Sequence, residues 1–228
     1  MNDLVTNTLE MSINVRQYGT THADKFPAGS AGAALFGTVG DLNDEMRGLA
    51  TLQAQNDRSY REQVTLKNAG LAVLRDQVET VARTARVMER AAPGLHDKFR
   101  LPDTTREQDL LATARGFAAD AVPLRDEFVR HGIAANFFND LADRIVSVEQ
   151  AIELTAQKAT ARVNATDALA AAAKRTRQVV RDLNPIVRNV MAGDEAALNE
   201  WERASHVERP ARRANGDAPG TNTPPANG

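Results

Sequence analysis

Apolar side chains recur at helical spacing along most of this chain. From about residue 31 they follow one another at steps of three and four: Leu35, Val39, Leu42, Met46 and Leu49. A later run forms a heptad seam: Leu71, Leu74, Val78, Val81, Ala85, Met88 and Ala92. These periods are typical of amphipathic helices that pack against other helices, as in a coiled coil. The pattern predicts helix up to Pro93-Gly94, a helix-ending pair.

A polar stretch, Asn56 to Ser59, separates the two runs. Ser59 with Glu62 matches a capping box, in which the hydroxyl and the carboxylate each satisfy an orphan amide at a helix start. We therefore expect a break at 56–59 and a new helix after it.

The next helix is predicted after a connection over residues 93–104, with Thr104 and Glu107, or Thr105 and Gln108, as its cap. Its apolar positions are Leu110, Ala114, Phe117, Ala121, Leu124 and Phe128. Pro123 should kink this helix, because proline lacks an amide donor and crowds the carbonyl four residues back. Gly132 is the expected stop.

Residues 134–191 carry one helical stripe without a phase break, from Phe138 to Val190. Its middle, Thr155 to Thr166, is polar or small, and Asn164 or Thr166 offers a cap for a restart. Asn184-Pro185 is also a typical start of a separate helix. Two arrangements remain open: the helices break near 56–59 and 160–166 and fold into a compact bundle, or they run through and two chains exchange halves in a dimer. The capping box and the polar seam favour the break.

The two ends differ from the middle. Residues 1–30 are predicted to be an N-terminal arm, with a short helix carrying Leu9, Ile13 and Tyr18 and then a loop. Residues 207–228 are rich in Pro, Gly, Asn and Arg, which predicts a disordered tail. The fold class is therefore all-α: an up-and-down bundle of four to five main helical segments over residues 31–206.

Composition narrows the function classes. The 228 residues include 39 alanines and 10 aromatic residues but no cysteine, which argues against a β-sandwich, a disulfide scaffold and a thiolate metal site. Lys and Arg number 28 against 30 Asp and Glu, so the net charge of -2 favours no polyanionic partner. The sequence also lacks a signal-peptide pattern and an apolar run of roughly 20 residues. We expect a cytoplasmic protein without a membrane partner.

Two glycines, Gly32 and Gly37, have the spacing of a phosphate-binding loop. However, the expected lysine is missing and no strand precedes them. We interpret them as a small-residue helix start, with Ser30 as its N-cap.

Metal binding has one weak candidate pattern. Glu127 with His131 and Glu202 with His206 stand four residues apart, on one face of a helix. The di-iron pattern of helical bundles instead needs two Glu-x-x-His pairs. We therefore predict no metal site and no cofactor.

A basic stretch comprises Lys174, Arg175, Arg177, Arg181 and Arg188. Nucleic-acid binding would require such a stripe for phosphate contacts, but few aromatic residues accompany it. A solvated outer face of the bundle is the favoured interpretation. Trp201 and Phe137-Phe138 are interpreted as packing anchors.

Several segments together resemble an uncharacterised family of bacterial helical proteins with no assigned function. They are Arg16–His22, Phe26–Ser30, Asp97–Pro102, Ile186–Asn189 and Trp201–Arg209. The resemblance implies a self-contained helical protein and no catalytic or binding residue.

The leading hypothesis is a non-catalytic helical-bundle scaffold or protein-interaction module, with a protein partner or self-association. The first alternative is a nucleic-acid-associated helical protein that uses the basic face 174–188 and the tail, with weak binding. The second is a metal-dependent enzyme built around Glu127 and His131. No catalytic, cofactor-binding or metal-ligating residue is assigned.

Overall fold

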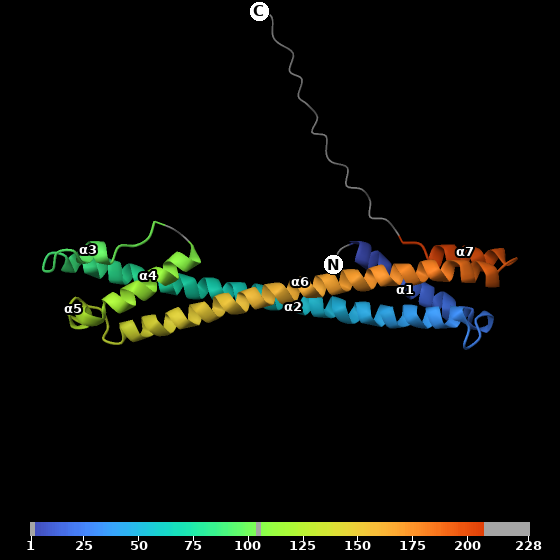
Figure 1. The fold of residues 1–228 in the computed structure, drawn as a ribbon, viewed down its shortest axis with the longest axis horizontal. Helices are drawn as coiled ribbons and strands as arrows, with labels where there is room; N and C mark the ends of the chain where they lie inside the picture. The colour runs from blue at the N-terminus through green and yellow to red at the C-terminus, as the bar shows by residue number, and fades with distance from the viewer. Residues whose placement is uncertain (1–2, 104–105, 208–228) are drawn as a thin grey trace, which may run out of the picture. The chain divides into compact units, whose positions relative to one another are not determined.

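A computed structural model describes residues 3–103 and 106–207 of the chain. Within these ranges the regular structure is entirely helical and no strand occurs, so the all-α class is confirmed there (Figure 1). In chain order the elements are α1 (Asp3–Thr21), η1 (Ala23–Lys25), α2 (Ala31–Met88), α3 (Leu95–Lys98), α4 (Glu107–Asp120), η2 (Val122–Leu124), α5 (Arg125–Arg130), α6 (Phe137–Val190) and α7 (Glu195–Ala204).

The chain divides into two compact units. Unit 1 takes the chain up to Gly48 and again from Leu169 onward, and unit 2 comprises Leu49–Ala168. This division differs from the predicted single domain over 31–206, because α2 and α6 each supply residues to both units.

The core of unit 1 includes the segment predicted as an arm. Met11, Val15 and Tyr18 of α1 are buried in one cluster with residues of α2, α6 and α7. Of the predicted apolar face, Tyr18 is buried and Leu9 is half-buried, but Ile13 was wrong, since it is 37% exposed. The buried face of α1 also contains two polar residues, Thr8 and Ser12, so it does not stand out as an apolar row in the sequence. Each of the two hydroxyls donates a hydrogen bond to a carbonyl of its own helix.

The core of unit 2 confirms the predicted heptad seam of α2 from Leu74 to Met88, with Leu71 partly buried. The end of the seam was wrong, because α2 stops at Met88 and Ala92 is exposed beyond it. The fully buried members of the seam are joined by four phenylalanines from the connection, α4, α5 and α6: Phe99, Phe117, Phe128 and Phe138. Pro123 interrupts the helix as expected, because α4 ends at Asp120 and a 3-10 turn separates it from α5. Gly132, with a φ of 95°, follows the end of α5 and confirms the predicted stop.

The predicted helix breaks are wrong. α2 runs unbroken through 56–59, so Ser59 and Glu62 form no capping box, and α6 runs unbroken through 160–166. The polar seam pairs across the two antiparallel helices within unit 2. The Asn56 amide donates to the Ala161 carbonyl (3.3 Å), and the Gln53 amide donates to the Thr166 hydroxyl (3.0 Å). These hydrogen bonds satisfy the polar groups without a turn.

The separate helix expected at Asn184-Pro185 is also wrong, because both residues lie inside α6. The caps predicted at Thr104 and Thr105 lie outside the described residues, and Arg106 occupies the N-cap position of α4. The tail predicted over 207–228 lies outside them too, apart from Val207, which packs against the unit 1 core.

Candidate interaction face

In unit 2, α4 covers one face of the pair formed by α2 and α6 (Figure 1). Two ion pairs accompany this packing. Lys67 Nζ lies 2.5 Å from Glu107 Oε1, which joins α2 to α4. Arg115 of α4 donates from Nε to Glu149 Oε1 of α6 at 2.9 Å. Charged and apolar contacts together hold α4 on this side of the pair.

A second face of the same pair carries a groove. We call it the open face and define it by Leu66 and Gly70 of α2 with Ser147, Ala151 and Leu154 of α6. The groove encloses about 300 Å³. Leu66 is 57% exposed and Leu154 is 39% exposed. The sequence explains this position, because Leu66 lies one heptad before Val73, and Val73 precedes the buried Leu74 by one position, about 100° around the helix.

The floor of the groove is low because its residues are small. A Cβ atom on Gly70 would lie 3.2 Å from Val148 Cγ2, so glycine permits close approach of the two helices here. Ser147 and Ala151 continue the small floor along α6. Two large apolar side chains thus border a shallow channel, a shape suited to receive another helix.

A polar group also lines the groove. Arg144 Nε is buried and has no hydrogen-bond partner within the ranges that the structure describes, and the same holds for Gln77 Oε1. Unsatisfied buried polar atoms cost free energy until a partner reaches them. Arg144 therefore offers a donor to an acceptor on a docked molecule.

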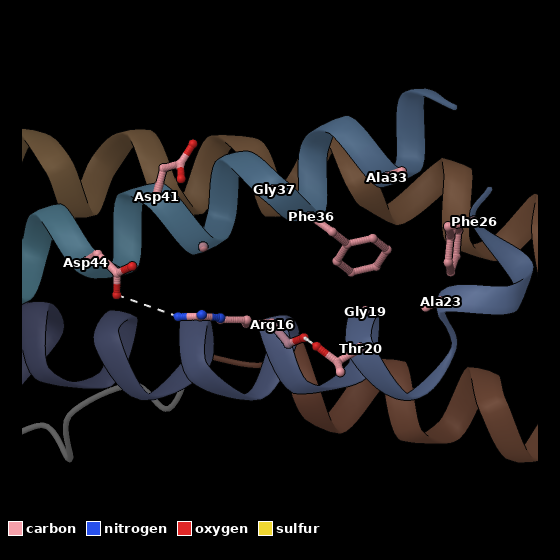
Figure 2. Close-up of a pocket in the computed structure, with 11 residues that line it drawn as sticks. Arg16, Gly19, Thr20, Ala23, Phe26, Ala33, Phe36, Gly37, Asp41 and Asp44 are labelled. Atoms are coloured by element: carbon pink, nitrogen blue, oxygen red, sulfur yellow. Dashed lines mark hydrogen bonds and ion pairs between the residues drawn. The ribbon is translucent and has the colours of Figure 1, made fainter. Parts of the chain in front are cut away.

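A second groove, of about 450 Å³, lies in unit 1 between α1 and α2 (Figure 2). Arg16 Nη1 lies 3.5 Å from Asp44 Oδ1 at one end, and Phe36 and Phe26 form the other end. The groove also contains Asp41. Its two carboxylates, Asp41 and Asp44, would repel a phosphate.

The Gly32 and Gly37 pattern is a helix start, as predicted. Ser30 Oγ accepts a hydrogen bond from the Ala33 amide (3.1 Å), which confirms the N-cap. Gly32 packs closely on Phe26, because a Cβ at that position would lie 2.6 Å from Phe26 Cδ1. Gly37 lies at the groove, in the second turn of α2.

The histidine pairs are engaged with neighbouring charges. His131 Nδ1 lies 3.7 Å from Glu127 Oε1 and 2.8 Å from the Glu127 carbonyl, while Arg130 also pairs with the Glu127 carboxylate. Glu202 pairs with Arg188 at 2.9 Å rather than with His206. Within residues 3–103 and 106–207 no three His, Asp or Glu side chains gather as metal ligands would.

The basic stretch makes contacts inside unit 1. Arg175 forms an ion pair with Glu45 (2.6 Å), and Arg177 donates to the Thr8 hydroxyl (2.9 Å). Arg181 donates to Gln178. These contacts tie Arg175, Arg177 and Arg181 to side chains of unit 1.

The aromatic residues are packing anchors, as predicted. Trp201 is fully buried, with its ring centroid 5.3 Å from that of Tyr18, and Phe138 is 3% exposed. Tyr18 Oη has no hydrogen-bond partner among the described residues, and burial raises the pKa of this phenol to about 12.

No family model, no curated protein and no solved structure matches this chain. No helix of the described residues is long and apolar enough to cross a membrane. The sequence interpretation did not single out the open face, because Leu66 and Leu154 lie beside the packing seams. A search for a second apolar row at seven-residue spacing, beside each packing seam, would have identified these residues.

Proposed function

We propose that this protein is a non-catalytic helical interaction module whose open face binds one amphipathic helix of a protein partner. The observation that carries the proposal is the exposure of Leu66 and Leu154 on the two sides of a groove with a small-residue floor. Complete burial of a large apolar side chain is worth about 1.5–3 kcal/mol, so a docked helix gains free energy at both borders.

The chemistry of the groove supports a helix rather than a small molecule. Its lining is mainly apolar and is formed by two helical rows that lie side by side, one on α2 and one on α6. A third helix in the groove would place its own apolar side chains, spaced three and four residues apart, between Leu66 and Leu154. An acidic residue on that helix would find the Arg144 guanidinium.

The docked helix would extend the paired helices into the bundle that the sequence predicts over residues 31–206. The proposal includes a cytoplasmic location, which suits a chain without cysteine.

A photo-reactive amino acid at Leu154 tests the proposal in the cells that produce the protein. We expect it to cross-link to a peptide with an apolar heptad or three-four pattern, identified by mass spectrometry. Val146 is the matched control, because it lies on the same helix and is more exposed (52%), but does not line the groove. Equal cross-linking at the two positions, or none at Leu154, would refute the open face as a binding site.

A further inference from the structure

An exposed apolar stripe runs along α2 in unit 2 at intervals of seven residues. We call it the outer stripe; its members are Leu52, Ser59, Leu66, Val73, Thr80 and Val87. The four apolar members are 44%, 57%, 41% and 58% exposed, in chain order. A seven-residue interval keeps side chains on one side of a helix that packs in a coiled coil. α2 thus has a second apolar row outside its buried seam.

The outer stripe has the same pattern in both directions. Its order is apolar, hydroxyl, apolar, apolar, hydroxyl, apolar, with its midpoint between Ala69 and Gly70. A second α2 placed antiparallel about this midpoint would set Leu52 against Val87 and Leu66 against Val73. The hydroxyls of Ser59 and Thr80 would share a layer. Thr80 needs no new partner there, because its hydroxyl donates to the Asp76 carbonyl at 2.8 Å.

Charges beside the stripe follow the same symmetry. Arg58 and Glu79 lie 21 residues apart, hence at the same heptad position, and both are exposed. Neither side chain forms an ion pair within the part of the chain that the structure describes. Their midpoint falls within about one residue of the midpoint of the stripe. An antiparallel copy would therefore bring Arg58 of each chain near Glu79 of the other, twice per dimer.

Small residues lie at the centre of this arrangement. Ala69 lies between Leu66 and Val73 along α2 and is exposed, as is Ala72 one turn further along. Without bulky side chains near the two-fold axis, two α2 helices can approach closely, and Leu66 of each chain can reach the row of the other.

We infer that α2 of a second copy of this chain packs antiparallel along the outer stripe, in register about Ala69-Gly70, and buries Leu66 at the border of the open face. The inference rests on the proposed function and names its partner. The interface is isologous, since the same residues of both copies form it. It joins two pairs of α2 and α6 into a four-helix arrangement in unit 2.

Cysteine cross-linking tests the register, because the natural chain has no cysteine. Under mild oxidation we expect Ala69→Cys to form a disulfide-linked dimer, because position 69 lies next to the axis in both chains. Leu52→Cys alone should remain uncoupled, whereas an equal mixture of Leu52→Cys and Val87→Cys should give a mixed dimer. A Leu52→Cys homodimer would mean parallel pairing and would overturn the inference.

A charge exchange tests the partner residues by sedimentation equilibrium. Arg58→Glu and Glu79→Arg should each weaken dimerisation by about tenfold, and the double variant should restore it. Lys174→Glu is the control, because Lys174 is an exposed cation on α6 in unit 1, outside the outer stripe, and should leave the dimer unchanged. The same register brings Glu62 near Asp76 of the other chain, so Glu62→Gln with Asp76→Asn should strengthen dimerisation. Failure of the double charge variant to recover would contradict the register.

The two proposals fail in different ways. A chain that stays monomeric up to about 100 μM, with no Ala69→Cys dimer, overturns the second copy as partner. If Leu154 still cross-links to a peptide of another protein, the open face remains a binding site for a different helix. If neither position couples to any chain, both proposals are wrong.

Discussion

Trp201 Nε1 of α7 donates a hydrogen bond to Asn184 Oδ1 of α6 at 3.0 Å. The indole is fully buried in the core of unit 1, and this carboxamide is its acceptor. Asn184 precedes Pro185, a pair typical of a helix start. In this fold the asparagine instead fixes α7 on an unbroken α6.

Asn184→Ala should lower the free energy of unfolding by about 1–3 kcal/mol, because the Trp201 N–H would remain buried without an acceptor. Chemical denaturation followed by tryptophan fluorescence measures this, since Trp201 is the single tryptophan of the chain.

Two variants control for this change. Asn184→Asp keeps an oxygen acceptor and should lose less stability than the alanine variant. Asn189→Ala, at an exposed position of the same helix, should leave stability nearly unchanged. A loss at Asn189 as large as at Asn184 would assign the effect to the helix rather than to the hydrogen bond.

Gly19→Ala should destabilise unit 1 by about 1–3 kcal/mol, because the new methyl group would lie 2.6 Å from Phe36 Cδ1 and displace that ring. Gly37→Ala is the matched variant, because Gly37 also lies inside a helix and its new methyl group would meet no described atom within 4 Å beyond the backbone of its own helix. It should stabilise the protein by about 0.5–1 kcal/mol through helix propensity. Thermal melts of both variants should therefore shift in opposite directions, and equal shifts would refute the close contact.

Glu89 should contribute to stability only while it is ionised. Its Oε1 accepts from the Gly94 amide (2.9 Å) and its Oε2 from the His96 amide (2.7 Å), and these hydrogen bonds lower the pKa of the carboxyl group. A lowered pKa in the folded state means that the contribution is present above the ordinary pKa of glutamic acid. It is lost as the pH falls through the lowered value.

Glu89→Gln tests this, because glutamine has one side-chain oxygen in place of the two carboxylate oxygens that accept hydrogen bonds from the two amides. It should melt below the parent at neutral pH, and the difference should shrink toward zero in acid. Glu10→Gln, at an exposed position of α1, should show no such convergence. A pH-independent difference for Glu89→Gln would show that the charge of the carboxylate is not the cause.

The sequence by itself determined the helical class and the local ends of several helices. Leu74, Val78, Val81, Ala85 and Met88 repeat at heptad spacing and are all buried, because such a period leaves a helix one apolar side. Pro123 and Gly132 ended helical segments as expected, since their backbone restrictions act without any partner. Ser30 capped α2 for the same local reason.

Only the tertiary structure decided what the polar positions do. In the sequence, the polar stretch around Asn56 and Gln53 is typical of a helix break. In the structure, their side-chain amides donate hydrogen bonds to Ala161 and Thr166, which lie more than a hundred residues away along the chain. Asn184 and Thr8 likewise bond to side chains of other helices, Trp201 and Arg177. A side-chain amide or hydroxyl fits a cap and a hydrogen bond between helices equally well, and only the neighbouring helix decides between them. The same holds for α2, which carries two apolar heptad rows. Its packing with α6 buries the row that contains Leu74 and leaves the row that contains Leu66 exposed.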